Sequence, residues 1–201
     1  MTSARRIGLT QRVDVWADRG ERRDALDQRW SALLELLGAW ALPIPNAARD
    51  VRALIRELRI DGVILTGGND LVAYGGDAPE RDRLENEILD VSLADGLPVV
   101  GVCRGMQLIQ HRFGGALERV SGHIGTSDIH LPDAGVRRVN SFHTFGFLTA
   151  PDGFQVWARA SDGVIEGMSH CTHAIHGMMW HPERNEPPER EDVVLLERLL
   201  R

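Results

Sequence analysis

The chain has 201 residues, a formal net charge of −6 at pH 7 and 43% hydrophobic residues, values typical of a folded globular protein. Its acidic balance argues against a protein that binds nucleic acids, and no apolar run approaches the roughly 20 residues of a membrane helix. All 23 basic residues are arginine. Because Schiff-base chemistry, pyridoxal phosphate anchoring and a P-loop all need a lysine, these functions are excluded.

The two cysteines, Cys103 and Cys171, are too few for a disulfide framework and fit a reducing compartment. The N-terminus has no apolar run of the length that a secretory signal requires. We therefore expect a cytoplasmic protein in which residues 1–201 form a single domain.

The first half of the chain alternates between predicted strands and helices. Periodicity and end signals predict strands over 7–15, 41–45, 61–68 and 97–103, and helices over 21–38, 47–59, 79–96 and 105–113. Shorter strands follow over 116–120, 137–145, 154–160, 163–168 and 174–180, before a last helix over 189–200. Near-continuous apolar strands separated by helices predict an α/β fold with a doubly wound, mostly parallel sheet, and the second half adds antiparallel strands.

The segment GVCRG (101–105) places Cys103 between two glycines, after an apolar strand and before a helix. This is the pattern of a nucleophile elbow, in which a tight strand-to-helix turn needs small residues on both sides of the nucleophile. Such a turn lifts the sulfur above the carboxyl edge of the sheet, at a helix N-terminus that favours a thiolate. Buried core cysteines are commoner, but the glycine frame favours a nucleophile here.

The segment MMWHPE (178–183) ends an apolar strand with His181 and Glu183 two residues apart. In an extended chain both side chains would lie on the same face, so that Glu183 could orient the imidazole of His181. His181 would then serve as the base for Cys103. The three letters H-P-E are a weak match alone, but beside a cysteine elbow they indicate a Cys-His-Glu triad.

The segment VILTGGND (63–70) is a buried strand that breaks at a double glycine. Backbone N–H groups in such a turn can face a developing oxyanion. We expect the amides of Gly68 and Arg104 to form a site with two donors. Taken alone, the double glycine is equally well explained as a tight turn.

In this order, GGND (67–70), GVCRGMQ (101–107), NSFH (140–143) and WHPE (180–183) resemble the class I glutamine amidotransferase-like γ-glutamyl hydrolases. The resemblance extends from about residue 8 to about residue 184. It implies a Cys-His-Glu triad on a flavodoxin-like sheet, and attack by Cys103 on a γ-glutamyl carbonyl to form a thioester. By position it also implies substrate contacts, for which a fold-supporting role is an equal alternative, from Gly67, Asn69, Gln107, Asn140, Ser141 and His143.

Two subtypes of this family compete. Hydrolases of γ-glutamyl-GABA usually carry two adjacent histidines in the S-x-H-H segment, where this chain has Thr144 in the second place. The hydrolases of γ-glutamyl-CDP-amidate in bacterial capsule synthesis are more similar, through TQR (10–12), GGNDL (67–71), RD (81–82), GHIG (122–125), NSFH and MWHPER (179–184). This similarity implies an anionic leaving group, cytidine diphosphoramidate, with Arg12 and Arg22 as candidate contacts, although surface arginines are usually only solvated.

Three other functions stay open at this point. The substrate could be γ-glutamyl-GABA or another γ-glutamyl amine, or the chain could be a glutaminase subunit that passes ammonia to a synthase partner. It could also be a metal-binding or sensor protein using His170, Cys171, His173 and His176, but their spacing matches no common zinc pattern. We expect a small-molecule γ-glutamyl substrate, no cofactor, no metal, no nucleic acid and no membrane. A homodimer through the surface helix predicted over 21–38 also stays open.

Overall fold

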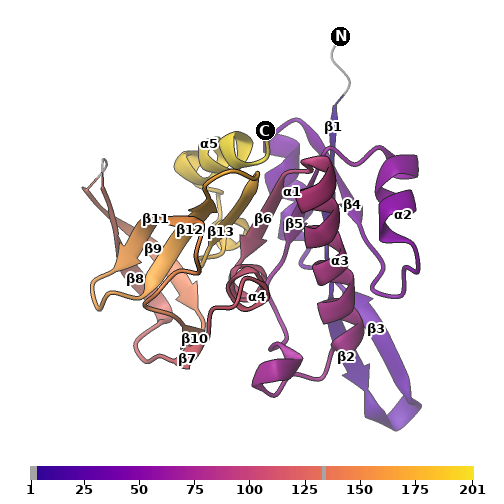
Figure 1. Ribbon diagram of the computed structural model, residues 1–201, viewed down its shortest axis with the longest axis horizontal. Helices are drawn as coiled ribbons and strands as arrows, with labels where there is room; N and C mark the ends of the chain where they lie inside the picture. Colours follow the sequence, from indigo (N-terminus) through magenta and orange to yellow (C-terminus); the bar gives the residue numbers. More distant parts are fainter. Residues whose placement is uncertain (1–3, 133–134) are drawn as a thin grey trace.

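The computed structural model describes residues 4–132 and 135–201, and a nine-stranded sheet runs through it in the order β4-β1-β5-β6-β13-β12-β11-β8-β9 (Figure 1). Its first five strands are parallel: β4 (Ala39–Pro43), β1 (Arg5–Leu9), β5 (Gly62–Leu65), β6 (Val99–Val102) and β13 (Ile175–Met178). Counted along the chain, they have the order 2-1-3-4-5 of flavodoxin-like sheets. The predicted doubly wound α/β fold is confirmed.

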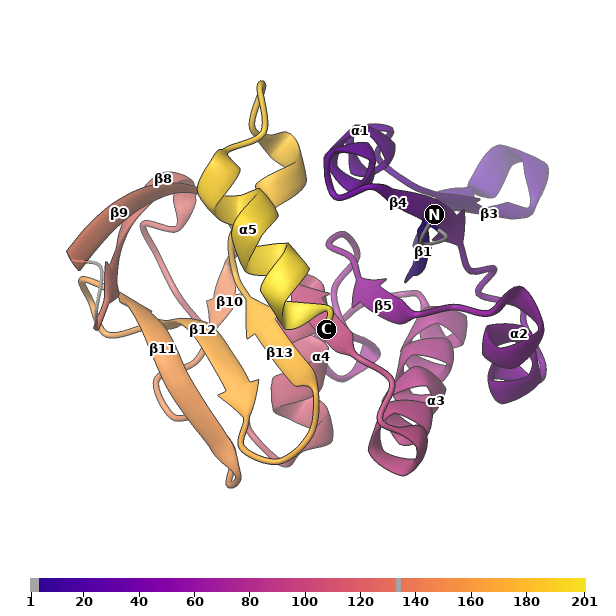
Figure 2. The same ribbon diagram turned by 90° about the horizontal axis from the view of Figure 1, so that it is seen from above.

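Helices cover both faces of the parallel strands, as Figure 2 shows. They are α1 (Arg29–Leu36) and α5 (Arg190–Leu199) on one face, and α2 (Val51–Leu58), α3 (Pro79–Asp95) and α4 (Arg104–Arg112) on the other. Because neighbouring side chains of a strand point to opposite faces, Val63 and Leu65 pack with the second group of helices while Ile64 packs with the first. This two-sided burial explains why the parallel strands are continuously apolar.

Four antiparallel strands extend the sheet: β12 (Ile165–His170), β11 (Phe154–Ala160), β8 (Ile124–Leu131) and β9 (Gly135–Phe142). They confirm the predicted antiparallel addition, but β8 was not predicted from the sequence. In this strand only Ile129 is buried. An exposed strand with one core residue has no apolar pattern to reveal it. A small separate pair, β7 (Glu118–Arg119) with β10 (Phe145–Gly146), lies next to this region.

The predicted strand 7–15 and helix 21–38 were both wrong in their bounds. After β1 the chain turns, and β2 (Arg12–Trp16) and β3 (Glu21–Ala25) pair as an antiparallel hairpin that projects from the sheet (Figure 1). Between them lies a short 3-10 turn, η1 (Ala17–Arg19), which ends at Gly20. The helix begins only at Arg29, because the residues of β3 are polar and gain their backbone partners from β2 rather than from a buried helix face.

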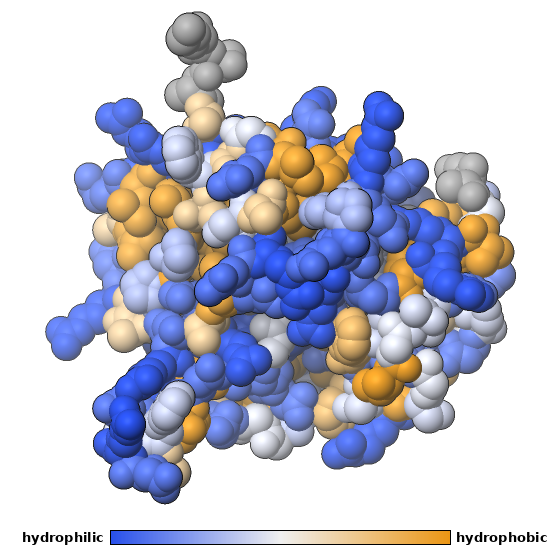
Figure 3. Space-filling model, turned by 180° about the vertical axis from the view of Figure 1, so that it is seen from behind, coloured by the Kyte–Doolittle hydropathy of each residue, from blue (hydrophilic) through white to orange (hydrophobic). Residues whose placement is uncertain are grey.

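Apolar side chains on the surface stand in separate groups among polar ones on the face that Figure 3 shows. The most exposed large ones include Trp40 (65%) and Leu36 (60%). Across the described ranges, no helix combines the length and the apolar character needed to cross a membrane. The homodimer stays a prediction.

Candidate active site

Cys103 lies in a strained turn between β6 and α4. Its φ is 52°, in the left-handed region that residues other than glycine rarely occupy, and its N–H donates to the carbonyl of Met178 at 2.9 Å. The glycines on either side have no room for a side chain. A Cβ on Gly101 would lie 2.5 Å from the carbonyl carbon of Gly105, and one on Gly105 would lie 2.1 Å from the carbonyl oxygen of Leu65. Close packing of α4 against β5 and β6 therefore requires both.

His181 and Glu183 form a buried hydrogen-bonded pair beyond the end of β13. The imidazole Nδ1 lies 2.7 Å from Oε1 of Glu183, and the residues are 2% and 3% exposed. The predicted reason, alternation along an extended strand, was wrong. Residues Pro182–Arg184 form a 3-10 turn, η3, which folds the carboxylate back onto the ring. Gly67 leaves the space for this ring, since a Cβ there would lie 2.5 Å from Cε1 of His181.

The environment of His181 favours its charged form. Burial of the imidazole acts to lower its pKa, but hydrogen bonds to Cys103 and Glu183 outweigh burial and raise the pKa of His181 to about 9. At neutral pH the ring is an imidazolium beside the sulfur of Cys103. An imidazolium in that position can stabilise a thiolate and later donate a proton to a leaving group.

The turn after β5 rests on a buried network of charges. Gly68 has a φ of 86°, and the guanidinium of Arg81 donates to the carbonyl oxygens of Gly68 and, at 2.6 Å, of Thr66. Arg81 and Arg104 both pair with the carboxylate of Glu85, which is fully buried. The Arg104 side chain is thus committed to the fold. The role predicted for Arg104 falls to its backbone amide in the first turn of α4, where N–H groups have no partner within the helix.

Asn69, a predicted substrate contact, braces the hairpin against the glycine turn. Its Oδ1 accepts from the N–H of Val13 at 2.8 Å, and its Nδ2 donates to the carbonyl of Val13 at 3.0 Å. The residue also lines the cavity beside Cys103. Its side-chain amide already has partners on both atoms within the fold.

The Gln107 and His143 side chains hold the segment that walls this cavity. Nε2 of Gln107 donates to the carbonyl of Phe145 at 2.9 Å, and Nδ1 of His143 lies 3.0 Å from the same oxygen. Ser141 donates through Oγ to the carbonyl of His123 at 2.9 Å. Gln107 and His143 line the cavity itself, whereas Ser141 is buried in the strand behind it.

Asn140, on β9, is paired with the backbone of His181. Its Oδ1 accepts from the N–H of His181 at 2.9 Å, and its Nδ2 donates to the carbonyl of His181 at 2.7 Å. This two-point contact fixes the peptide units on both sides of the imidazole. The sequence signal for it was the NSFH segment, but the spacing did not reveal which residue Asn140 would contact.

Two cavities of about 310 and 280 Å³ adjoin at the carboxyl edge of the sheet and share Gly68, His181 and Arg184 as lining residues. Cys103 opens into the first cavity, and Arg12 lines the second. Arg184 was missed from the sequence, although the segment MWHPER contains it. Its guanidinium lies over the ring of Phe142, 4.6 Å from the centroid.

The two arginines proposed from sequence differ in position. Arg12 lies against the glycine turn, since a Cβ on Gly68 would meet its Cδ at 3.1 Å, and it pairs with Asp14 at 2.7 Å. Arg22 instead pairs with Glu80 at 2.7 Å and donates to the carbonyl of Asp77. Only Arg12 is a lining residue of the second cavity.

The histidines and cysteine between residues 170 and 176 are engaged separately. Nδ1 of His170 accepts from the N–H groups of Thr172 and His173 at 3.1 Å, and Nδ1 of His176 lies 2.8 Å from Oγ of Ser169. Within the part of the chain that the structure describes, these side chains do not bring three ligand atoms together. The zinc or sensor site predicted there as an alternative is wrong.

A family model, Peptidase C26, matches residues 7–133 and 129–183. The chain belongs to the Peptidase C26 family. The γ-glutamyl-CDP-amidate hydrolase of Campylobacter jejuni is 32% identical over 181 residues, 89% of this chain and 90% of that protein. These findings confirm the resemblance to class I glutamine amidotransferase-like hydrolases and identify this Peptidase C26 protein as a hydrolase.

Two solved structures share the fold of this Peptidase C26 member. A candidate GMP synthase glutaminase component from Thermoplasma acidophilum superimposes with a TM-score of 0.75 at 18% identity, covering 99% of this chain and 94% of the other. A glutamine amidotransferase from Thermotoga maritima gives 0.70 at 16% identity, covering 98% and 88%. At these identities the similarity establishes the architecture.

Proposed function

We propose that the chain hydrolyses a γ-glutamyl amide bond through a thioester on Cys103. The observation that carries this proposal is the hydrogen-bonded series Glu183–His181–Cys103 at the carboxyl edge of a flavodoxin-like sheet. In open α/β sheets, ligands bind at this edge. A buried imidazolium between a carboxylate and a strained elbow cysteine is an arrangement suited to acyl transfer.

In the first half-reaction, the Cys103 thiolate attacks the γ-carbonyl carbon and forms a carbon–sulfur bond. The backbone amides of Gly68 and Arg104 stabilise the developing oxyanion. The carbon–nitrogen bond then breaks as the His181 imidazolium gives its proton to the leaving nitrogen. Glu183 holds the imidazole in the required orientation throughout.

In the second half-reaction, neutral His181 takes a proton from water, whose oxygen attacks the thioester carbon. The carbon–sulfur bond breaks, the thiolate leaves, and glutamate is released with the thiolate–imidazolium pair restored. The cavity lined by Cys103, Asn69 and Gln107 would hold the glutamyl group, with the Gly67–Gly68 turn beside it.

The leaving group would occupy the adjoining cavity, and γ-glutamyl-CDP-amidate is the substrate we favour. This proposal is supported by Arg12 and Arg184, two guanidinium groups that can pair with a diphosphate. It is also supported by the relative from Campylobacter jejuni, which matches nearly the whole chain. Glutamate and cytidine diphosphoramidate would be the products.

Glutamate release from γ-glutamyl-CDP-amidate, γ-glutamyl-GABA and glutamine tests this function directly. The three substrates are compared for the wild-type protein and for Cys103→Ala. We expect the highest kcat/KM with the nucleotide conjugate and no turnover by the variant. A preference for γ-glutamyl-GABA would keep the chemistry and overturn the substrate. Slow turnover of glutamine alone would instead indicate a glutaminase that needs a synthase partner.

A further inference from the structure

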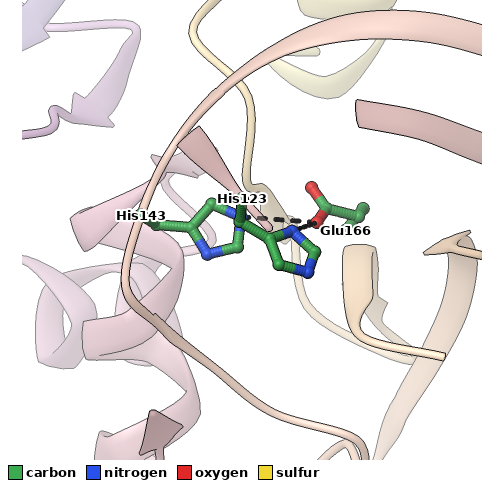
Figure 4. Close-up of side chains that lie close together, drawn as sticks. All are labelled: His123, His143 and Glu166. Carbon is green, nitrogen blue, oxygen red and sulfur yellow. Dashed lines mark ion pairs between the residues drawn. The ribbon is translucent and has the colours of Figure 1, made fainter. Parts of the chain in front are cut away.

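A second cluster of titratable side chains lies in the antiparallel part of the molecule (Figure 4). His123 directly precedes β8, His143 directly follows β9, and Glu166 lies on β12. Their exposed fractions are only 3%, 4% and 0%. One nitrogen from each ring and a carboxylate oxygen lie within 4.8 Å of one another. None of the three side chains takes part in the reaction steps proposed above.

The outer nitrogen of each ring has a partner that fixes the tautomer. Nδ1 of His143 lies 3.0 Å from the carbonyl oxygen of Phe145, which can only accept, so this nitrogen carries a hydrogen. Nε2 of His123 lies 2.9 Å from the carboxylate of Asp162 and donates in the same way. In a neutral imidazole the other nitrogen then presents a lone pair. Both lone pairs are directed toward Glu166 (Figure 4).

The inner atoms of the cluster have no hydrogen-bond partner among the described residues. Nδ1 of His123 is 3.2 Å and Nε2 of His143 is 3.4 Å from Oε1 of Glu166, but neither contact has hydrogen-bond geometry. Both oxygens of the Glu166 carboxylate are likewise unpartnered. A buried carboxylate and two buried nitrogens without partners are costly unless a positive charge lies among them.

The spacing of these atoms suits a metal ion better than a direct contact. Zinc bonds to nitrogen and oxygen are about 2.0–2.1 Å long, which places tetrahedral ligands about 3.3 Å apart. The two separations from Oε1 of Glu166 are 3.2 and 3.4 Å. Histidine ligands of metals also typically donate their other N–H to a carboxylate or a backbone carbonyl. Asp162 and Phe145 supply these two partners here.

We propose that His123, His143 and Glu166 bind a divalent transition-metal ion, with zinc the best fit to two imidazoles and one carboxylate. The remaining coordination position would hold water. This proposal departs from the sequence-based expectation of a metal-free protein. It does not depend on the proposed hydrolytic function, because it rests on other side chains.

The bound ion would fasten one wall of the Cys103 cavity. His143 and Phe145 both line that cavity, and the carbonyl of Phe145 is held by His143 and Gln107 together. The ion would therefore join β8, β12 and the segment after β9 at a point next to the substrate. Its role is structural, since no step of the reaction requires it.

Zinc content and zinc affinity of the purified full chain test the site. The parent protein is Cys103→Ala/Cys171→Ser, which removes both thiols as competing ligands. Metal analysis is followed by removal of the metal and titration with zinc against a chromophoric chelator, and cobalt is used to report coordination by its visible spectrum. The variants are His143→Gln, Glu166→Gln and Asp162→Asn. The matched control is His130→Gln, a change at an exposed histidine on β8 that contacts Ser161.

We expect the parent to bind about one equivalent of zinc, and His143→Gln and Glu166→Gln to weaken binding by at least about 100-fold. Asp162→Asn should weaken it by about 10–100-fold, as loss of an outer partner does. Asp162 is half-exposed, so this variant keeps the test decisive if a core variant fails to fold. His130→Gln should bind as the parent does. A parent without stoichiometric zinc, or with equal affinity in all the variants, would overturn the proposal and leave the cluster held by protons alone.

Discussion

The parallel and antiparallel parts of the sheet contribute different kinds of group to the site. Cys103 and His181 follow β6 and β13, and the glycine turn follows β5, so the reacting groups all come from carboxyl ends of parallel strands. The antiparallel part contributes Asn140 and the His143 segment, which hold those groups in place. Chemistry placed at parallel strand ends follows from the topology. Its support depends on how the antiparallel strands curl back toward it.

The largest effect is expected from the reacting group itself. Cys103→Ala should lower kcat by at least about 10⁴-fold, because no other group can form the thioester. The midpoint of thermal unfolding should change little. Cys171→Ser is the control, since that thiol is exposed and free. Activity of Cys103→Ala near that of the wild type in the glutamate-release assay would refute the assignment.

The charge state of His181 should set the upper limit of the pH profile. Its pKa is raised to about 9, so the imidazolium is present through neutral pH and is lost as the pH rises through about 9. We expect kcat/KM to fall along that limb, because the neutral ring cannot protonate the leaving nitrogen. The stability that this charge contributes follows the same sign: it is complete below the ordinary value of 6.5 and is lost toward pH 9. A limb near 6.5 would contradict the proposed ion pair.

The buried charge network under the glycine turn should matter mainly for stability. Burial acts to raise the pKa of Glu85, but Arg104 and Arg81 outweigh it and hold that pKa below its usual value. Glu85→Gln leaves two buried guanidinium groups without their counter-charge and should cost about 3–5 kcal/mol in urea unfolding. Asp95→Asn, which breaks an exposed ion pair with Arg52, should cost less than about 1 kcal/mol. Equal costs would show that Glu85 is not needed to balance the charge.

Asn140 tests whether the antiparallel strands act by positioning. Asn140→Ala removes both contacts to the His181 backbone and should lower kcat by about 10–100-fold, with KM nearly unchanged. Asn86→Ala is the matched control, because it removes a single amide contact to the carbonyl of Asp82 away from the imidazole. A parallel loss of stability and activity in both variants would point to a general structural effect.

The smallest effect is expected at the edge of the second cavity. Arg12→Ala should raise KM for γ-glutamyl-CDP-amidate by about 10-fold, as the loss of one exposed charge-assisted hydrogen bond implies, and should leave glutamine turnover unchanged. Arg22→Ala, whose guanidinium pairs with Glu80, should change neither. If KM for both substrates rises equally in Arg12→Ala, that arginine does not recognise the leaving group.

Local patterns were informative where the chain is buried on both sides. The apolar runs before Gly67 and Cys103 predicted β5 and β6, and the glycines around Cys103 predicted the elbow, because steric exclusion there acts between near neighbours. The same patterns failed for β3 and β8. Their side chains are mostly exposed, so partner strands rather than a hydrophobic period decide their conformation.

The sequence by itself determined the parallel α/β core, the strained elbow at Cys103 and the pairing of His181 with Glu183. Each depends on burial or on residues close together in the chain. Only the tertiary structure decided that Asn140 holds His181, that Arg184 stands between the two cavities, and that His123, His143 and Glu166 meet. These contacts join segments up to about 40 residues apart, and their geometry depends on the twist and register of the whole sheet.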